Sequence, residues 1–347
     1  MKDSFFPRCG ILYLHLAFES KAWLRSGMRS GPVSLLFLAF TLAGCISHPG
    51  SPARPVALDK NAADKIVKEI EKERADDQDW LRGSPTSYLA AIDRVNFGEK
   101  KTLSVGSAPE NDVRLLAPDI EPHHLRITLD GDHFRVVGLD ANARFKIKDE
   151  TRREAMLDPS FLGVGRFMLR LSHQRFPAII VFDPRSPHFN EYKGLAYFPI
   201  DLSYRYELPL ERYPKPRKIT IGSTRGNARA AEVVGRVEFM VGRTPCRLEA
   251  TRLTEPGAGE DPLEIFFCDA SGGKETYPLG RYVDLKKLDN GNYLLDFNLA
   301  YNPACAFSDF YNCPIPPKSN TLRVEIRAGE KDAHYHHSPD SQTTPIR

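Results

Sequence analysis

The polar residues of this sequence that are best suited to chemistry gather between positions 269 and 302. They are Asp269, Glu275, Arg281, Asp296, Asn298, Tyr301 and Asn302. Asp296 and Asn298 are two residues apart in an expected strand, so their side chains should point to the same face. Arg281 is expected to pair with Asp269 or Asp296. In a concave pocket, such a group would supply carboxylates for acid–base chemistry and amides for orienting a ligand.

Three interpretations of this candidate pocket stay open. It could be a hydrogen-bonded network that holds loops, since Asp and Asn beside Pro and Gly often do so. It could instead bind a ligand, or form the site of a hydrolase that uses Asp269, Asp296 and Arg281. A hydrolase needs its carboxylates in one cleft, about 5 to 10 Å apart, whereas a network buries them in separate pairs. We favour a protein that binds a ligand or partner over an enzyme.

Alternating apolar residues predict that these side chains belong to a β domain over residues 190–331. The alternation is clear at Val237, Phe239 and Val241, and again at Leu263, Ile265 and Phe267. Turn signals at Gly272-Gly273 and Asn290-Gly291 separate the strands. Many short strands with regular turns are typical of a sandwich or barrel.

A first β domain is expected over residues 95–183, before a Pro-containing hinge. Residues 125–129 and 134–137 have short strand patterns, and Asp130-Gly131 predicts a hairpin between them. Residues 178–182 are continuously apolar and predict a fully buried strand.

An amphipathic helix over residues 59–82 should pack on this body. Asp59 or Asn61 can cap it. Its apolar stripe consists of Ala63, Ile66, Val67 and Ile70. Trp80 and Leu81 should pin the chain to the body. The predicted fold is therefore mainly β, with two β-sandwich- or barrel-like domains preceded by a signal peptide and this one helix.

Residues 28–44 have the features of a secretory signal peptide: a positive start, an apolar run too short to cross a membrane, and small residues before Cys45. Leu42-Ala43-Gly44-Cys45 also resembles the bacterial lipobox. The resemblance implies cleavage before Cys45, lipidation of that residue and a place in the cell envelope facing the periplasm. Ile46 favours the outer membrane over the inner one. A buried N-terminal helix is the alternative.

The remaining terminal segments are also expected to lie outside the folded body. Residues 45–58 would form a flexible tether. Residues 1–27 are interpreted as an over-long start, or as an unusually long segment before the apolar run. Residues 332–347 are expected to be a disordered tail, in which His334, His336 and His337 would bind metal only adventitiously.

Four cysteines remain in the exported chain, and an oxidising compartment allows three pairings of them. We predict a disulfide between Cys305 and Cys313, which close a loop with prolines nearby. Cys246 and Cys268 are interpreted either as a pair or as buried thiols in strands.

The net charge and composition of the chain limit the classes of partner that can be expected. The formal net charge is only +3 over 347 residues, and no stripe of Lys and Arg interleaved with aromatic residues occurs, so nucleic acid is not expected as a partner. No cofactor and no metal site is predicted. The expected partners are a membrane, through the lipid on Cys45, and an unidentified small ligand or envelope protein.

Several motifs of the second domain resemble the bacterial domain of unknown function 1684 family. They are residues 194–201, 267–277, 280–282, 295–305 and 313–317. The resemblance covers residues 62–331 and implies a shared shape, with no established reaction. Ile179-Ile180 depart from the family pattern, which has a basic residue in this region.

The first domain resembles a degenerate forkhead-associated sandwich. The resemblance lies in residues 106–115 and in His123-His124-Leu125. That fold binds phosphothreonine through an Arg after the glycine and a Ser before the histidine. Ser107 stands at the Arg position and Glu121-Pro122 precede the histidines, so the guanidinium clamp is missing. The resemblance therefore implies the shape of this fold without phosphopeptide binding.

Overall fold

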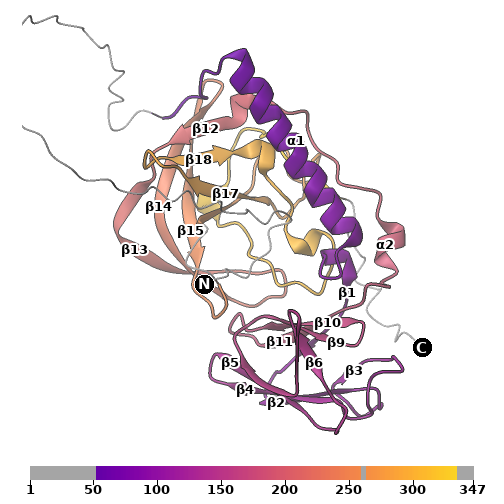
Figure 1. Cartoon of the computed structure of the whole chain (residues 1–347). Helices are drawn as coiled ribbons and strands as arrows, with labels where there is room; N and C mark the ends of the chain where they lie inside the picture. The colour runs from indigo at the N-terminus through magenta and orange to yellow at the C-terminus, as the bar shows by residue number, and fades with distance from the viewer. Residues whose placement is uncertain (1–51, 259–262, 334–347) are drawn as a thin grey trace, which may run out of the picture.

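The structure, a computed structural model, describes residues 52–258 and 263–333. One long helix is followed by two β units that lie against each other (Figure 1). The predicted signal peptide, Cys45 and the histidines of the tail lie outside the described residues. The mainly β fold class predicted from the sequence is confirmed. Within the described part of the chain, no helix is long and apolar enough to cross a membrane.

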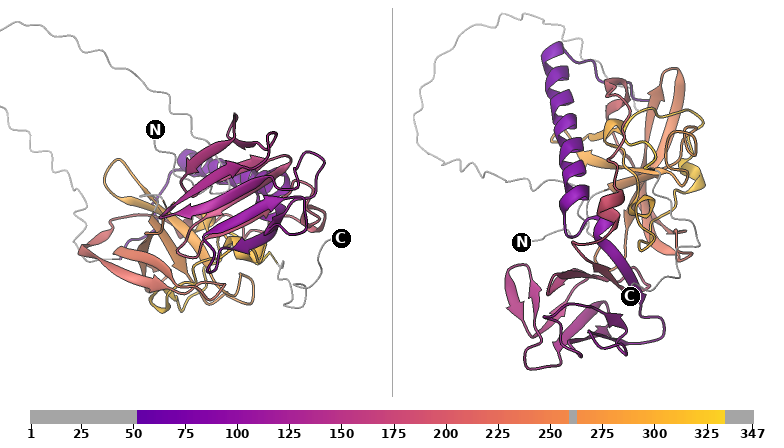
Figure 2. Two further views of the ribbon diagram at one scale, coloured as in Figure 1. Left: turned by 90° about the horizontal axis from the view of Figure 1, so that it is seen from below. Right: turned by 90° about the vertical axis from the view of Figure 1, so that its right-hand side faces the viewer.

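The long helix α1, Lys60–Gly83, lies along the second β unit, and its C-terminal end approaches the first (Figures 1 and 2). Asp59 caps it as predicted, because one carboxylate oxygen accepts a hydrogen bond from the N–H of Ala62 at 2.9 Å. Ile70 and Leu81 are buried. The helix thus packs on the body, with Ile70 of the predicted stripe buried and Ala63, Ile66 and Val67 half-buried.

Two polar side chains of α1 also hold it to the second β unit. Arg74 donates hydrogen bonds to the carbonyls of Phe198 and Asn298, both at 3.0 Å. Gln78, one turn later, accepts a hydrogen bond from the N–H of Leu195 at 2.6 Å. Because these partners are backbone groups of the β unit, the helix is fixed in both position and rotation.

The first β unit consists of a six-stranded sheet in the order β1-β11-β10-β9-β6-β7 and a five-stranded sheet in the order β3-β2-β4-β5-β8. Figure 2 shows its strands side by side from below. The hairpin predicted at Asp130-Gly131 is confirmed, since Asp130 pairs with His133 and Gly131 has φ +60°, a conformation open to glycine. The strand bounds are β1 Ala91–Asn96, β2 Thr102–Gly106, β3 Val113–Arg114, β4 Leu125–Asp130, β5 His133–Gly138, β6 Phe145–Ile147, β7 Glu150–Arg152, β8 Glu154–Leu157, β9 Phe161–Val164, β10 Phe167–Ser172 and β11 Ala178–Phe182.

Strand β11 is buried along its whole length, as predicted. Ile179 and Val181 point into the core between the two sheets. Ile180 and Phe182 point the other way and pack with Tyr311 of the second unit. Because a strand covered on both faces needs no polar alternation, this arrangement explains the continuous apolar run. The two β units therefore share an apolar interface.

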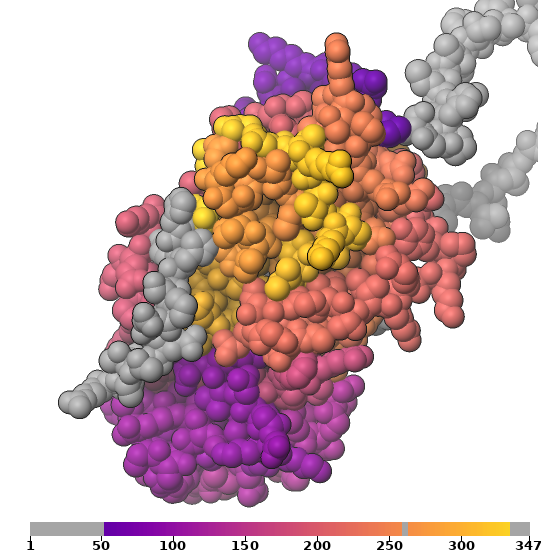
Figure 3. All heavy atoms as spheres, turned by 180° about the vertical axis from the view of Figure 1, so that it is seen from behind, coloured from indigo at the N-terminus to yellow at the C-terminus, as the bar shows by residue number. Residues whose placement is uncertain are grey.

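The second β unit is a seven-stranded antiparallel sheet that forms a half-barrel, in the order β12-β18-β17-β16-β15-β14-β13. Phe297 lies at the centre of its core and contacts the rings of Tyr206, Phe239 and Phe267. In Figure 3, the C-terminal segment in yellow lies on the surface of this unit. The bounds are α2 His188–Glu191, β12 Arg205–Leu208, β13 Glu211–Ile221, β14 Arg229–Val241, β15 Thr244–Leu253, β16 Leu263–Phe267, β17 Arg281–Lys287 and β18 Tyr293–Asp296.

Candidate functional site

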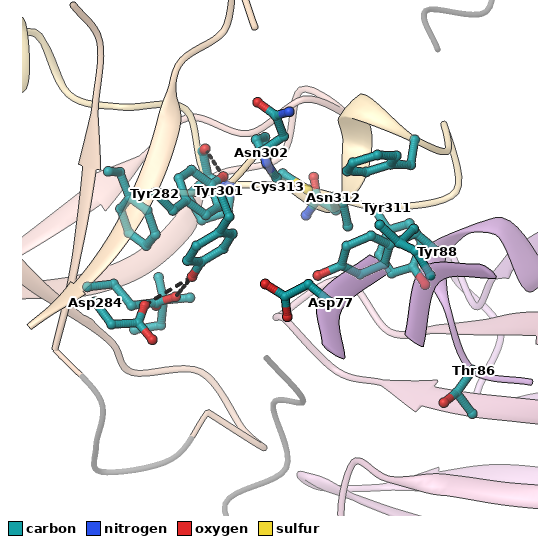
Figure 4. Close-up of a pocket in the computed structure, with 18 of the residues that line it drawn as sticks. Asp77, Thr86, Tyr88, Tyr282, Asp284, Tyr301, Asn302, Tyr311, Asn312 and Cys313 are labelled. Carbon is teal, nitrogen blue, oxygen red and sulfur yellow. Dashed lines mark hydrogen bonds between the residues drawn. The ribbon is translucent and has the colours of Figure 1, made fainter. Parts of the chain in front are cut away.

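A cavity of about 170 Å³ lies where α1 and the two β units meet. Its walls come from the C-terminal half of α1, from β1, β10 and β11, from β14 to β17, and from the loop over residues 299–314. Figure 4 shows Tyr301 and Asp284 on one side and Tyr88 and Tyr311 on the other, with Asp77 between them. The cavity thus needs both β units and the helix to form.

Aromatic rings make one wall of this cavity. Tyr88, in the short helix η1 Tyr88–Ala90, stacks on Phe307 with 5.7 Å between ring centroids and meets Tyr311 edge-on at 5.2 Å. Trp80 of α1 meets Tyr88 edge-on at 5.0 Å. These rings hold each other in place and offer apolar surface with a few polar edges, which suits an apolar group of a ligand.

Two carboxylates belong to neighbouring strands of the cavity wall. Glu264 of β16 and Asp284 of β17 are direct cross-strand partners, so their side chains lie on the same face of the sheet. The hydroxyl of Tyr301 donates a hydrogen bond to Asp284 at 3.1 Å and lies 3.4 Å from an oxygen of Glu264. Tyr301 therefore sets the position of this acidic pair.

Glu330 is a buried carboxylate at the same cavity. One of its oxygens accepts a hydrogen bond from the N–H of Asn302 at 2.8 Å. Burial raises the pKa of Glu330 to about 7, although the Asn302 N–H and the positive charges of Arg281 and Arg74 act in the opposite direction. This group consequently changes its charge near neutral pH.

Three arginines line the cavity from three strands, namely Arg94 of β1, Arg170 of β10 and Arg229 of β14. Arg229 is neutralised by Glu255, to which it donates three hydrogen bonds of 2.6 to 3.0 Å. Arg94 differs, because it donates only to Asn96 Oδ1 at 3.0 Å and to the Phe310 carbonyl at 3.1 Å. Among the described residues, no carboxylate lies within 4.0 Å of the Arg94 guanidinium.

The positive charge of Arg94 is buried and lies near other positive charges. The residue is 9% exposed. Burial lowers the pKa of Arg94 to about 10, and repulsion from Arg225, Arg170 and Arg229 acts in the same direction. A buried cation surrounded by further cations is destabilising unless an anion joins it.

Several buried polar atoms at the cavity have no hydrogen-bond partner in the described part of the chain, and four of them belong to three almost fully buried side chains. These four are Nη2 of Arg94, Oδ1 of Asn302, and both Oδ1 and Nδ2 of Asn312. The three residues are each at least nine-tenths buried. Leaving such an atom unsatisfied costs about 1 to 3 kcal/mol, so a cluster of four calls for a physical explanation. A bound group that fills the cavity would provide one.

The seven residues nominated from the sequence fall into separate places. Asp269 and Arg281 form a buried ion pair, 2.6 Å between Oδ2 and Nη2, and each side chain is 1% exposed. Arg281 also donates to the carbonyls of Ile326, Ala328 and Glu330. A smaller cavity of about 100 Å³ lies beside this pair. The pair itself ties the C-terminal segment to β17, which is the geometry of a structural network.

Asp296 and Asn298 form a second network. Asp296 pairs with Arg205 and accepts hydrogen bonds from the N–H and the amide of Asn298 at 3.0 and 2.9 Å. The expectation that both residues share a strand was wrong: β18 ends at Asp296, and Asn298 lies in the short helix η3 Phe297–Leu299. The reason is the Asp296 carboxylate, which caps that helix. Glu275 lies apart, on the surface, paired with Arg327.

Only Tyr301 and Asn302 of the nominated set line the large cavity. Sequence reasoning missed Arg94 and Asn312. Arg94 stands beside Asp93 in a short strand of the other β unit, and nothing in this local pattern marks it as a site residue. Asn312 directly precedes Cys313, the first residue of a motif that resembles the family. This position beside the motif is the feature that could have indicated Asn312.

The predicted disulfide between Cys305 and Cys313 is wrong. All four cysteines of the described chain are free thiols. The loop is closed by hydrogen bonds instead: the N–H of Cys305 donates to Cys313 Sγ at 3.2 Å, and Cys305 Sγ lies 3.6 Å from the Tyr277 hydroxyl. Cys246 and Cys268 are likewise free thiols. Cys246 is buried in β15, as one of the two interpretations held, whereas Cys268 is half-buried and follows the end of β16.

The segment that carries Tyr301, Asn302 and Asn312 also carries a family match. Residues 190–331 match the family described as Protein of unknown function (DUF1684). The resemblance seen in the sequence is confirmed over this range. The DUF1684 segment contains the half-barrel and one side of the cavity. Helix α1 and the first β unit, which contains Arg94, lie outside the match.

Solved structures give weaker likenesses. An uncharacterized protein of Haloarcula marismortui is 32% identical, and the match covers 44% of this chain and 85% of that one, with a TM-score of 0.35. A forkhead-associated domain, studied for phosphothreonine-dependent interactions, is 18% identical over 23% of this chain and 75% of its own, with a TM-score of 0.18. EmbR of Mycobacterium tuberculosis, in complex with a low-affinity phosphopeptide, is 15% identical over 36% and 32%, with a TM-score of 0.19. The forkhead-associated resemblance stays a prediction. None of the curated proteins matches the sequence.

Proposed function

We propose that this protein is a lipid-anchored envelope protein that binds a small ligand in the cavity between its two β units. One observation carries the proposal: four unpartnered polar atoms, on side chains from both units, line a single cavity. Ligand pockets occur preferentially at such boundaries, with apolar walls and a few polar groups that fix orientation. The aromatic wall around Tyr88 supplies the apolar part.

The hydrolase alternative has less support. Asp269 and Asp296, the carboxylates it would use, are held in two separate networks, each with its own arginine. Acid–base work needs carboxylates that can reach one substrate. The large cavity, with its unpartnered amides, is arranged for holding a molecule.

Co-purification tests the binding function. The full chain is extracted from its own envelope in mild detergent, and mass spectrometry identifies the small molecules released on denaturation. We expect one compound to be retained by the wild type and lost from Asn312→Leu, which removes two of the unpartnered atoms at similar volume. The exposed Asn142→Leu is the matched control and should keep the compound. If wild type and Asn312→Leu retain the same compounds in equal amounts, the proposal fails.

The lipid anchor has its own test. Cys45→Ser removes the sulfur that would carry the lipid, and a single missing anchor is enough to release a protein that has no other membrane attachment. We expect the variant to move from the membrane fraction to the soluble fraction of the cell envelope. Replacement of Cys246, a thiol in the body, should leave fractionation unchanged. Equal membrane recovery of wild type and Cys45→Ser would rule out the anchor.

A further inference from the structure

We propose that the ligand is a small amphipathic anion, whose carboxylate or phosphate pairs with Arg94 and whose apolar body lies against Tyr88, Phe307 and Tyr311. This inference rests on the proposed function and specifies the chemical class of its ligand. It starts from Arg94, an arginine of the cavity for which the described residues provide no counter-charge.

The charge of Arg94 indicates whether its unpartnered Nη2 is satisfied by a water molecule or by an anion. A water molecule can accept a hydrogen bond from Nη2, but it cannot offset a positive charge that is 9% exposed and repelled by Arg170 and Arg229. Arg229 needs no further anion, because Glu255 already neutralises it. An anionic group beside Arg94 would satisfy the free N–H and the charge together, through a charge-assisted hydrogen bond.

The acidic residues of the cavity do not fill this role. Glu264 and Asp284 are held at Tyr301, on β16 and β17. Asp77 extends from α1 towards the space between Tyr301 and the aromatic wall (Figure 4). Neither these three nor Glu73 and Glu330, the other acidic residues of the cavity, lie within ion-pair distance of Arg94. The position next to Arg94 therefore lacks a negative charge of the protein's own.

The rest of the cavity fits the other end of such a molecule. Asn312 lies close to Tyr311 in the cavity wall (Figure 4), and both of its amide atoms are unpartnered. An amide can both donate and accept, and can therefore orient the group that joins an anionic head to an apolar body. Asn302 Oδ1 adds an acceptor for a donor on the ligand. A free inorganic anion would leave the aromatic wall and these amides unused.

Calorimetric titration of the detergent-solubilised full chain tests the inference. The probes are phenylacetate, its neutral isostere phenylacetamide, phenyl phosphate, and the two heads alone, acetate and inorganic phosphate. We expect phenylacetate or phenyl phosphate to bind at least about 30-fold more tightly than phenylacetamide, the size expected for a buried charge pair. Acetate and inorganic phosphate should bind more weakly than the aryl anions, and preference between the two aryl anions separates a carboxylate from a phosphate ligand.

Substitutions of Arg94 test whether this residue causes the preference for an anion. Arg94→Met, which keeps much of the side-chain volume, should remove the preference for the anion, and Arg94→Lys should restore part of it. Arg135→Met, at an exposed arginine of the same unit, should change nothing. The comparison of charged and neutral probes on the wild type needs no variant, so it holds even if Arg94→Met folds poorly.

Two outcomes would overturn the inference. Equal affinity for phenylacetate and phenylacetamide, with or without Arg94, would mean that the cavity binds a neutral molecule. Absence of binding by both aryl anions at millimolar concentration would reject this ligand class. In either case a compound that co-purifies with wild type and is lost from Asn312→Leu would leave the proposed function standing, so the two failures are distinguishable.

Discussion

Asp269→Asn is expected to lower the free energy of unfolding by about 3 to 5 kcal/mol. The change keeps the size of the side chain but leaves the Arg281 guanidinium buried without its counter-charge. It also weakens the acceptor for the N–H of Ile326, which Asp269 binds at 3.3 Å. Urea denaturation of wild type and variant, followed by circular dichroism, measures the difference.

Glu275→Gln is the matched control, because Glu275 was nominated from the same stretch of sequence. Its ion pair with Arg327 lies at the surface, where the side chain is 33% exposed. Such pairs contribute about 0 to 1 kcal/mol. If both variants shifted the urea midpoint equally, the pair formed by Asp269 and Arg281 would not have the structural role that its burial indicates.

Glu330→Gln is expected to raise the free energy of unfolding by about 3 kcal/mol near pH 8 and to change it little near pH 4. The pKa of Glu330 is raised from 4.5 to about 7 in the folded protein, chiefly by burial. The folded state therefore holds this proton more tightly than the unfolded chain does. The stability that the protonated carboxyl contributes is present below about pH 4.5 and is lost as the pH rises to about 7. Gln keeps an oxygen that can accept the Asn302 N–H and never ionises.

Denaturation at the two pH values checks this result. Glu99→Gln, at an exposed carboxylate, should show no pH-dependent difference from wild type. A Glu330→Gln variant whose stability differs from wild type by the same amount at both pH values would show that folding does not raise the pKa of Glu330.

The parts of the fold that follow from local pattern could be predicted from the sequence. Asp59 caps α1 and the Asp130-Gly131 turn closes a hairpin, since each feature depends on residues a few positions apart. The buried strand β11 was visible as an apolar run, although the reason for it, a second unit on its outer face, was not.

The site could be predicted only in part, because it joins distant segments. Arg94 and Asn312 are more than 200 residues apart, and nothing local links them. The turn at Asn298 was missed because a carboxylate cap outweighed the alternation of the preceding strand. The disulfide was predicted from spacing and compartment, while the orientation of the two thiols depends on the N–H of Cys305 and on Tyr277, which is distant in the sequence.

Helix α1 also separates the tether from the cavity. It has 24 residues, which at 1.5 Å per residue is a rod about 36 Å long. Its first residue follows the tether, and its last two turns carry Asp77 and Trp80 to the cavity. In a chain anchored at Cys45, the anchored end and the proposed ligand cavity would therefore lie at opposite ends of α1. A ligand would then enter the cavity at a distance of about one helix length from the point where the chain leaves its tether.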